Sequence, residues 1–280
     1  MKKYLELIRT NHWIKNLLIF IPMICAKVIN YNNIITTFIG FLSFSLTSSF
    51  IYIINDIKDL ESDKLSERKK LRPLANGKIS KKVALIIAII IIIISLLLNC
   101  YLNKGIFNAP TYVLLSYIII NIAYSLGLKN IPIIDICLLA SGFIIRIYYG
   151  ASLLNIEVSN WLFLTILNAS LFIGLGKRKK EFLINKDIRK VLAKYNENFL
   201  DKFEYLTLTL LIVFYSLWTM EQNNKYLIYT VPFLIIIFMK YCLILENESE
   251  GDPITIIYKD KSLLILCTIY SILMFIILTI

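Results

Sequence analysis

Length, composition and charge place this chain among integral membrane proteins and exclude several other classes. Its 280 residues are 58% hydrophobic with a mean hydropathy of +0.71, which is far too apolar for a soluble domain. The formal net charge of +11 comes from basic segments that flank apolar runs, and no nucleic-acid-binding pattern accompanies it, so we expect no nucleic acid partner. The five cysteines are isolated, which indicates neither a disulfide framework nor a metal site.

The sequence contains nine apolar candidate segments, and several of them, though not the short first one, are close to the ~20 residues that a helix needs to cross a bilayer. They are Leu17–Ile29, Ile34–Ile54, Val83–Leu102, Pro110–Leu126, Ile131–Leu154, Trp161–Gly176, Phe203–Met220, Tyr226–Leu245 and Leu263–Ile280. We therefore expect an all-α, polytopic integral membrane protein, a bundle of nine transmembrane helices that forms one domain over residues 1–280. The segment Val83–Leu102 shows no polar face and is expected to face lipid. The charged stretch Asp187–Lys202 is expected to form a short amphipathic helix.

The distribution of Lys and Arg predicts a cytoplasmic N-terminus. With that orientation, the inner side holds nine cations from Lys58 to Lys82 and nine from Lys177 to Lys202. The outer ends keep only Lys27, Lys104 and Lys225. Because cytoplasmic segments carry the excess of basic residues, we expect the charged loops on the cytoplasmic side of a bacterial-type inner (cell) membrane, against its phospholipids.

A polar segment from Asn55 to Lys82, between two apolar runs, carries carboxylates first and cations second. On a helix, the spacing of Asp56, Asp59 and Asp63 places all three within about 60° of one another, with Asn55 at the edge of that arc. Oxygen ligands without His or Cys point to Mg²⁺, with Mn²⁺ as the alternative. The stripe therefore predicts a metal site that carries a diphosphate.

Cations follow this acidic stripe within a loop's reach. Lys69, Lys70 and Arg72 are expected to grip phosphate oxygens that the metal leaves free. Lys15 and Asn16, at the mouth of the first span, are candidates for touching a polar ligand, although Lys15 is equally suited to lipid phosphate. The alternative for the whole segment is a solvated amphipathic loop.

Charged residues inside one apolar segment suggest a polar cavity. Asp135 and Arg146 are eleven residues apart and share a helix face with Gly142, with Tyr149 nearby. An ion within the membrane costs several kcal/mol unless it is paired or wetted. A structural pair between helices is the alternative. Tyr124 and Lys129, in the preceding cytoplasmic segment, are further candidates for substrate contact.

The end of the sixth apolar segment is strongly basic. Lys177, Arg178 and Lys180, followed by Glu181, suggest a cationic phosphate subsite, in contrast to the acidic segment after the second apolar run. Two structural roles are the alternatives to a subsite. Lys177 and Glu181 have the i, i+4 spacing of a helix-surface pair, and basic residues normally flank the cytoplasmic end of a span.

With these motifs in hand, the chain resembles the UbiA superfamily of intramembrane transferases, and within it the decaprenyl-phosphate phosphoribosyltransferases. The resemblance rests on Asn55-Asp56-x-x-Asp59-x-x-x-Asp63, Arg72-Pro73 with Gly77, Trp13–Asn16, Ser125–Ile136, Ser141–Arg146 and Gly176–Glu181. Three departures stand out. Lys177–Glu181 replaces the second Asp-rich motif of the aromatic prenyltransferases, Ser66-Glu67 replaces a His-Pro, and a glycine-rich loop is reduced to Gly251-Asp252-Pro253.

The resemblance implies transfer of 5-phosphoribose from phosphoribosyl diphosphate (PRPP) to a polyprenyl phosphate, with release of diphosphate. Asp56, Asp59, Asp63 and Asn55 would hold Mg²⁺, and Lys177 with Arg178, or Lys129 with Arg146, would hold the acceptor phosphate. One alternative is a prenyltransferase that uses a prenyl diphosphate and an aromatic or other lipid acceptor. Another is a carrier of polyprenyl phosphates without catalysis. A homo-oligomer is compatible with either enzyme.

Overall fold

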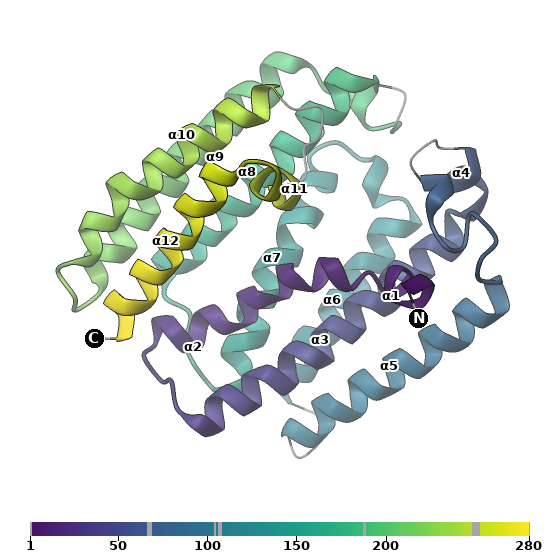
Figure 1. Ribbon diagram of the computed structural model, residues 1–280, viewed down its shortest axis with the longest axis horizontal. Helices are drawn as coiled ribbons and strands as arrows, with labels where there is room; N and C mark the ends of the chain where they lie inside the picture. Colours follow the sequence, from purple (N-terminus) through teal and green to yellow (C-terminus); the bar gives the residue numbers. More distant parts are fainter. Residues whose placement is uncertain are drawn as a thin grey trace. The chain divides into compact units, whose positions relative to one another are not determined.

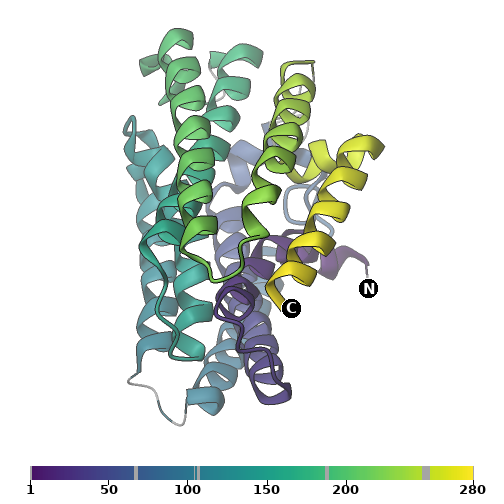
Figure 2. The same ribbon diagram turned by 90° about the vertical axis from the view of Figure 1, so that its left-hand side faces the viewer.

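The computed structural model describes residues 2–65, 69–103, 105, 108–186, 189–247 and 253–279. Within these ranges the chain forms helices and connecting loops without a strand, which confirms the all-α prediction (Figures 1 and 2). Two compact units emerge. The first comprises Met1–Ser125 with Ile145–Glu157, and the second comprises Leu126–Ile144 with Val158–Ile280. The expected single domain over residues 1–280 stays a prediction.

The first unit is built around a long helix, α3. Its elements are α1 (Lys2–Ile8), the 3₁₀ helix η1 (Thr10–Phe20), α2 (Ile21–Cys25), α3 (Tyr31–Lys58), α4 (Leu60–Leu65), η2 (Lys69–Leu71), α5 (Lys81–Asn103), α6 (Ala109–Leu126) and the C-terminal half of α7 (Ile134–Leu153). The side chain of Asn30 caps α3 by accepting the Asn33 backbone N–H at 2.9 Å. With 28 residues, α3 is about 42 Å long, enough to cross the hydrocarbon layer.

Helices α3 and α5 lie side by side (Figure 1) and are joined by buried hydroxyl groups. Ser43 Oγ donates to the Ser95 carbonyl at 2.9 Å, and the Thr47 and Ser95 hydroxyls lie 2.7 Å apart. The prediction that α5 has no polar face was therefore wrong. The isoleucine run dominates the sequence of α5, but Ser95 and Asn99 follow it, and both face the interior of the unit.

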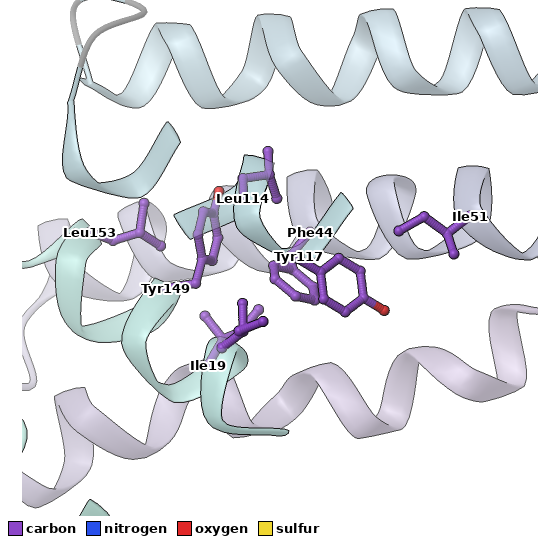
Figure 3. Packing of buried hydrophobic residues seen from close by; sticks show 8 residues of the cluster. Ile19, Phe44, Ile51, Leu114, Tyr117, Tyr149 and Leu153 are labelled. Carbon is purple, nitrogen blue, oxygen red and sulfur yellow. The ribbon is translucent and has the colours of Figure 1, made fainter. Parts of the chain in front are cut away.

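An apolar core connects α3 to η1, α6 and α7 (Figure 3). The Phe44 and Tyr117 rings lie together with a centroid separation of 4.6 Å, and Tyr149 donates to Asn99 Oδ1 at 2.8 Å. Gly150 is required where α7 meets η1, because a Cβ atom there would lie 2.0 Å from the Ile19 carbonyl oxygen. The two backbones therefore touch without an intervening side chain.

The second unit is a group of long helices. Its elements are the 3₁₀ helix η3 (Leu128–Asn130), the N-terminal half of α7, α8 (Asn160–Ile184), η5 (Leu192–Lys194), α9 (Glu197–Glu221), η6 (Leu227–Tyr229), α10 (Thr230–Asn247), α11 (Pro253–Lys259) and α12 (Lys261–Thr279). Helices α8 and α9 pack along each other, as do α10 and α12, which are light green and yellow in Figure 2. The Asn196 side chain caps α9.

The short separate helix expected over Asp187–Lys202 is not observed, and among the described residues of that stretch only 197–202 are helical, as the start of α9. Residues 189–196 form loop with one 3₁₀ turn, and α9 begins only at Glu197. The reason is the cap: Asn196 takes an extended conformation and starts a new helix, which interrupts the amphipathic pattern.

Seven helical stretches of the described chain are long and apolar enough to span a membrane. They are Tyr31–Lys58, Lys81–Leu102, Ala109–Leu126, Ile134–Leu153, Glu197–Glu221, Leu227–Glu246 and Lys261–Thr279. The first predicted span is instead split between η1 and the five-residue α2, and α8 combines apolar turns with buried polar and charged residues. Nine spans and a cytoplasmic N-terminus therefore stay predictions, whereas a polytopic membrane protein is confirmed.

Candidate functional site

Two acidic side chains lie at the end of α3 and in α4, linked by a shared arginine. Helix α3 ends at Lys58, Asp59 forms its C-cap, and the Asp63 N–H donates to the Asp59 carbonyl at 2.8 Å. Because the helical repeat continues almost unbroken, Asp56 and Asp63 face the same side. Arg72 Nη1 donates to Asp56 Oδ1 at 3.1 Å and to Asp63 Oδ2 at 2.5 Å. Both carboxylates are buried, at 3% and 1% exposure.

Two further cations contact this acidic pair. Arg9 Nη2 lies 2.5 Å from Asp56 Oδ1, so Arg9 and Arg72 share one carboxylate oxygen. Lys69 Nζ lies 3.6 Å from Asp63 Oδ1. We name Arg9, Asp56, Asp63, Lys69 and Arg72 the acidic-pair cluster. Its two negative charges are contacted by three positive ones.

The loop that follows α4 is held in place by apolar contacts, and it delivers Arg72. Leu74 and Ile79 pack with Leu7 and Ile53 in one buried cluster, and the Ile79 N–H donates to the Pro73 carbonyl at 3.0 Å. Gly77 has a φ of 75°, a left-handed conformation that glycine adopts without strain. Arg72 therefore lies on a loop whose position is determined by the core of the unit.

The acidic pair fits a divalent cation in two respects. Arg72 Nη1 lies on both carboxylates, the place that a bridging cation would take, and Asp63 Oδ1 is buried without a hydrogen-bond partner. Among the described residues, however, no three His, Cys, Asp or Glu side chains are grouped closely enough to hold a metal. The structure thus joins Asp56 and Asp63 and does not bring Asp59 to them. Asn55 Oδ1 accepts the Ser125 hydroxyl at 2.5 Å, which orients that amide toward α6.

A second polar centre of this unit surrounds Arg146. Its Nε donates to Asn16 Oδ1 at 2.7 Å, its Nη2 donates to the Tyr117 hydroxyl at 3.3 Å, and its guanidinium carbon lies 5.3 Å from the Phe44 ring centroid. Asn16 is fully buried and donates to the hydroxyls of Ser45 and Ser48. The structure therefore brings the predicted residues Asn16 and Arg146 together, with Asn16 orienting the guanidinium.

Asp135 and Arg146 share a helix but not a site. Asp135 accepts from Arg178 Nε at 2.5 Å and from the Tyr195 hydroxyl at 2.6 Å, and Tyr195 in turn accepts the Ile133 backbone N–H. Arg178 Nη1 lies 2.6 Å from Glu181, which also pairs with Arg189. The Asp135 and Arg178 side chains are fully buried. Burial and the hydrogen bond to Asp135 raise the pKa of Tyr195, so its hydroxyl stays protonated.

This buried network changes the interpretation of two predicted site residues, Arg178 and Asp135. Arg178 is enclosed between Asp135 and Glu181, so its guanidinium fixes the end of α8 against the Ile133 turn. The sequence had suggested that Arg178 grips a phosphate directly. The structure supports the alternative of a structural ion pair for Arg178 and Asp135 because both side chains have no exposed surface.

The neighbouring lysines of α8 have different surroundings. Lys179 Nζ lies 2.6 Å from Asp201 and 3.3 Å from Glu204. Burial alone would lower the pKa of Lys179, but the hydrogen bonds and charges of Asp201 and Glu204 outweigh it and raise that pKa. Lys180 is buried and donates to the Glu246 carbonyl at 3.2 Å. The other predicted contact residues Lys15, Tyr124, Lys129 and Lys177 are half-buried, and Lys70 is exposed.

The profile of the UbiA prenyltransferase family matches residues 17–277. The chain belongs to the UbiA prenyltransferase family. Decaprenyl-phosphate phosphoribosyltransferase from Mycolicibacterium smegmatis is 30% identical over 284 residues, which cover 94% of this chain and 88% of that protein. The protein of the same name from Corynebacterium glutamicum is 30% identical over 276 residues, which cover 94% and 82%.

Solved structures of UbiA proteins agree with the fold. A UbiA homologue from Archaeoglobus fulgidus, bound to GPP and Mg²⁺, matches with a TM-score of 0.74 at 19% identity, over 99% of this chain and all of that one. A digeranylgeranylglyceryl phosphate synthase structure matches with a TM-score of 0.69 at 20% identity, over 99% and 98%. At these identities the likeness concerns the fold alone. Family membership, the curated relatives and the membrane-spanning helices make this UbiA-family protein an integral membrane enzyme. Its fold is that of the solved structures.

The main residue of the acidic-pair cluster that the sequence did not indicate is Arg9. It lies 47 residues before Asp56, and only the fold brings the two together. The one signal in the sequence was the i, i+4 pair of Tyr52 and Asp56, because an aromatic ring beside a carboxylate is a favourable place for an arginine. In the structure the Arg9 guanidinium carbon lies 4.8 Å from the centroid of the Tyr52 ring. Two family departures, Ser66-Glu67 and Gly251-Asp252 of the Gly251–Pro253 loop, lie outside the described residues.

Proposed function

We propose that this chain transfers 5-phosphoribose from PRPP to a polyprenyl phosphate. The observation that carries the proposal is its 30% identity, over 94% of its length, to proteins named decaprenyl-phosphate phosphoribosyltransferase. In this reaction a phosphate oxygen of the lipid bonds to the anomeric carbon of the ribose. The anomeric C–O bond to the diphosphate breaks, and the diphosphate leaves with the electron pair. The acceptor is already an anion, so no strong general base is needed.

The acidic-pair cluster is the proposed place of the donor diphosphate. Asp56 and Asp63 would hold a divalent ion, Mg²⁺ or alternatively Mn²⁺, with Asn55 and Asp59 as further ligand candidates. The bound ion would supply neutralisation of the negative charge that builds up on the leaving diphosphate. Support comes from the oxygen-only donor set and from the A. fulgidus homologue, whose structure holds GPP and Mg²⁺.

The chain's own cations orient the charged substrates. Arg72, Lys69 and Lys70 follow the acidic pair and are candidates for the phosphates of PRPP, since guanidinium and ammonium groups hold phosphate oxygens by charge-assisted hydrogen bonds. Lys129 and Lys177 are half-buried candidates for binding the lipid phosphate. Arg146 is a further candidate, and its guanidinium is oriented by the hydrogen bond to Asn16. Holding donor and acceptor in line is the main contribution that these side chains make to the rate.

The proposed location follows from the charge distribution. We place the charged segments on the cytoplasmic side of a bacterial cell membrane, where PRPP as a soluble, highly charged donor would approach, while the polyprenyl tail stays in the bilayer. The support is the excess of Lys and Arg in those segments and the seven helical stretches suited to span the membrane.

A donor comparison tests the proposal. Purified full-length protein in detergent, with Mg²⁺ and a polyprenyl phosphate, should form lipid-linked phosphoribose and release diphosphate from PRPP, whereas geranyl diphosphate should give no product. Turnover of geranyl diphosphate alone would establish the second candidate, a prenyltransferase, which the A. fulgidus structure with bound GPP favours. Transport of polyprenyl phosphate without any product would establish the third, a carrier.

Two variants test the acidic pair within the same assay. Asp56→Asn should lower the rate by about 100-fold or more, because loss of one charged ligand removes several kcal/mol of electrostatic stabilisation. The matched control is Glu61→Gln, which removes an exposed carboxylate of α4 that pairs only with Lys64 in the described structure. Equal rates for Asp56→Asn and Glu61→Gln would discard the metal assignment.

A further inference from the structure

Arg9 occupies an unusual backbone conformation between α1 and η1. Its φ and ψ are both 52°, in the left-handed region that residues with a Cβ atom rarely adopt. Contacts on both sides hold this conformation. The Ile8 carbonyl accepts the Ser49 hydroxyl at 2.7 Å, and the His12 N–H donates to the Arg9 carbonyl at 2.9 Å. Such conformations persist where the surrounding structure enforces them, often at functional sites.

The segment that carries Arg9 is anchored to α3. Leu7 is fully buried in a cluster with Ile53 and Leu74, and Trp13 Nε1 donates to Ser49 Oγ at 3.0 Å. These anchors lie on either side of Arg9, so its guanidinium is directed along α3 over Tyr52 toward Asp56. The fold of this segment therefore determines the position of the guanidinium.

The charge balance at Asp56 is unusual for a purely structural pair. Arg9 and Arg72 both contact the same oxygen, Oδ1, although Arg72 alone neutralises one carboxylate charge. The Arg9 side chain keeps 19% of its surface exposed, in contrast to 4% for Asp56. A guanidinium has five donors in a planar fork that suits two phosphate oxygens, and a single carboxylate oxygen uses little of that capacity.

We propose that Arg9 is a diphosphate-binding residue of the donor site that rests on Asp56 until a divalent ion takes that carboxylate. This inference rests on the proposed function, since it requires a divalent ion at Asp56. A cation that binds Asp56 repels the guanidinium at 2.5 Å from the same oxygen, and the guanidinium then turns to the nearest new anion. With PRPP present, that anion is the diphosphate beside the ion.

The proposal predicts opposite changes in two affinities when the arginine is removed. In Arg9→Met, the competing positive charge is lost, so Mg²⁺ alone should bind roughly three-fold more tightly. The same variant lacks the proposed phosphate contact, so inorganic pyrophosphate in saturating Mg²⁺ should bind about ten-fold more weakly. A merely structural role for Arg9 would weaken both affinities together.

Isothermal titration calorimetry on the full-length protein in detergent measures both affinities without turnover. The matched control is Lys64→Met, which removes one positive charge from α4 at an ion pair with Glu61 and should change neither affinity by more than about two-fold. Arg9→Lys keeps the charge and loses the planar fork. It should leave Mg²⁺ binding near that of the wild type and still weaken pyrophosphate binding, which provides the test if Arg9→Met does not fold.

Three results would overturn the inference, and they are distinguishable from failure of the proposed function. If both affinities fall in parallel, Arg9 has only a structural role. If the Arg9 variants behave like Lys64→Met while wild-type protein binds Mg²⁺ and pyrophosphate, Arg9 is not part of the donor site and the proposed function stands. If the wild type binds no divalent ion, or if Asp56→Asn binds it as tightly, the metal assignment fails and the inference fails with it.

Discussion

Loss of Asp135 should destabilise the second unit strongly. In Asp135→Ala, the fully buried Arg178 loses its 2.5 Å partner but keeps its contact with Glu181, while the Tyr195 hydroxyl loses its acceptor. Removal of one partner from a buried ion pair typically costs about 3–5 kcal/mol, because the remaining charge stays desolvated. We expect a loss of unfolding free energy in that range.

Two further variants separate the ion pair from the hydroxyl group. Tyr195→Phe leaves the pair intact but deprives the Ile133 N–H of its acceptor, and it should cost about 1–3 kcal/mol. The double variant Asp135→Leu with Arg178→Leu removes both charges. It should be less destabilised than the sum of the two single variants by about 2 kcal/mol or more.

Equilibrium unfolding by SDS in mixed micelles, followed by tryptophan fluorescence, measures these differences. The reasoning would be refuted if Asp135→Ala cost less than Tyr195→Phe, or if the double variant showed no coupling. Either outcome would mean that Arg178 finds compensating partners or water when Asp135 is absent.

Further predictions concern backbone contact, a buried amide and the metal. Gly150→Ala should destabilise the protein by about 1–3 kcal/mol, because its Cβ would meet the Ile19 carbonyl. Gly105→Ala should be neutral in the same unfolding assay, since no atom of the described residues lies within 4 Å of the added Cβ. Asn16→Leu should lower the free energy of unfolding by about 2 kcal/mol, because Arg146 Nε loses its acceptor. The control Asn11→Leu, at an exposed position, should change that free energy little, and equal effects of the two variants would contradict the prediction. Mg²⁺ at about 100 times its dissociation constant should stabilise the wild type by about 2.7 kcal/mol without substrate, and a chelator or Asp56→Asn should remove that gain.

Helical periodicity explains what could be predicted from the chain. Asp56 and Asp63 are about two helical turns apart, so helical spacing alone predicts that they face the same side, as their shared contact with Arg72 shows. The all-α class and most spans follow likewise from hydropathy. These features depend on neighbours in sequence, for which spacing and composition carry the information.

Partners distant in sequence could not be predicted in this way. Asp135 and Arg146 lie on one face of α7 as expected, yet Asp135 pairs with Arg178, 43 residues further along the chain. Spacing within a helix indicates which side chains share a face, but it does not indicate which neighbouring element supplies the partner. For the same reason the contacts of Arg9 with Asp56 and of Ser95 with Thr47 could not be predicted. The division of the first predicted span between a 3₁₀ segment and a short helix with Pro22 could not be predicted from its uniformly apolar composition.

The hydroxyl contacts between α3 and α5 also link the acidic pair to the lipid. A slide of α3 by one helical turn, about 5.4 Å, would break the bonds of Ser43 and Thr47 to Ser95, and hydrocarbon offers these groups no substitute partner. Helix α5 has exposed isoleucines, including Ile86, Ile90 and Ile93, which suit contact with acyl chains. If α5 shifts in a thicker or thinner bilayer, we expect α3 to shift with it. The distance of Asp56 from the aqueous boundary would then change as well.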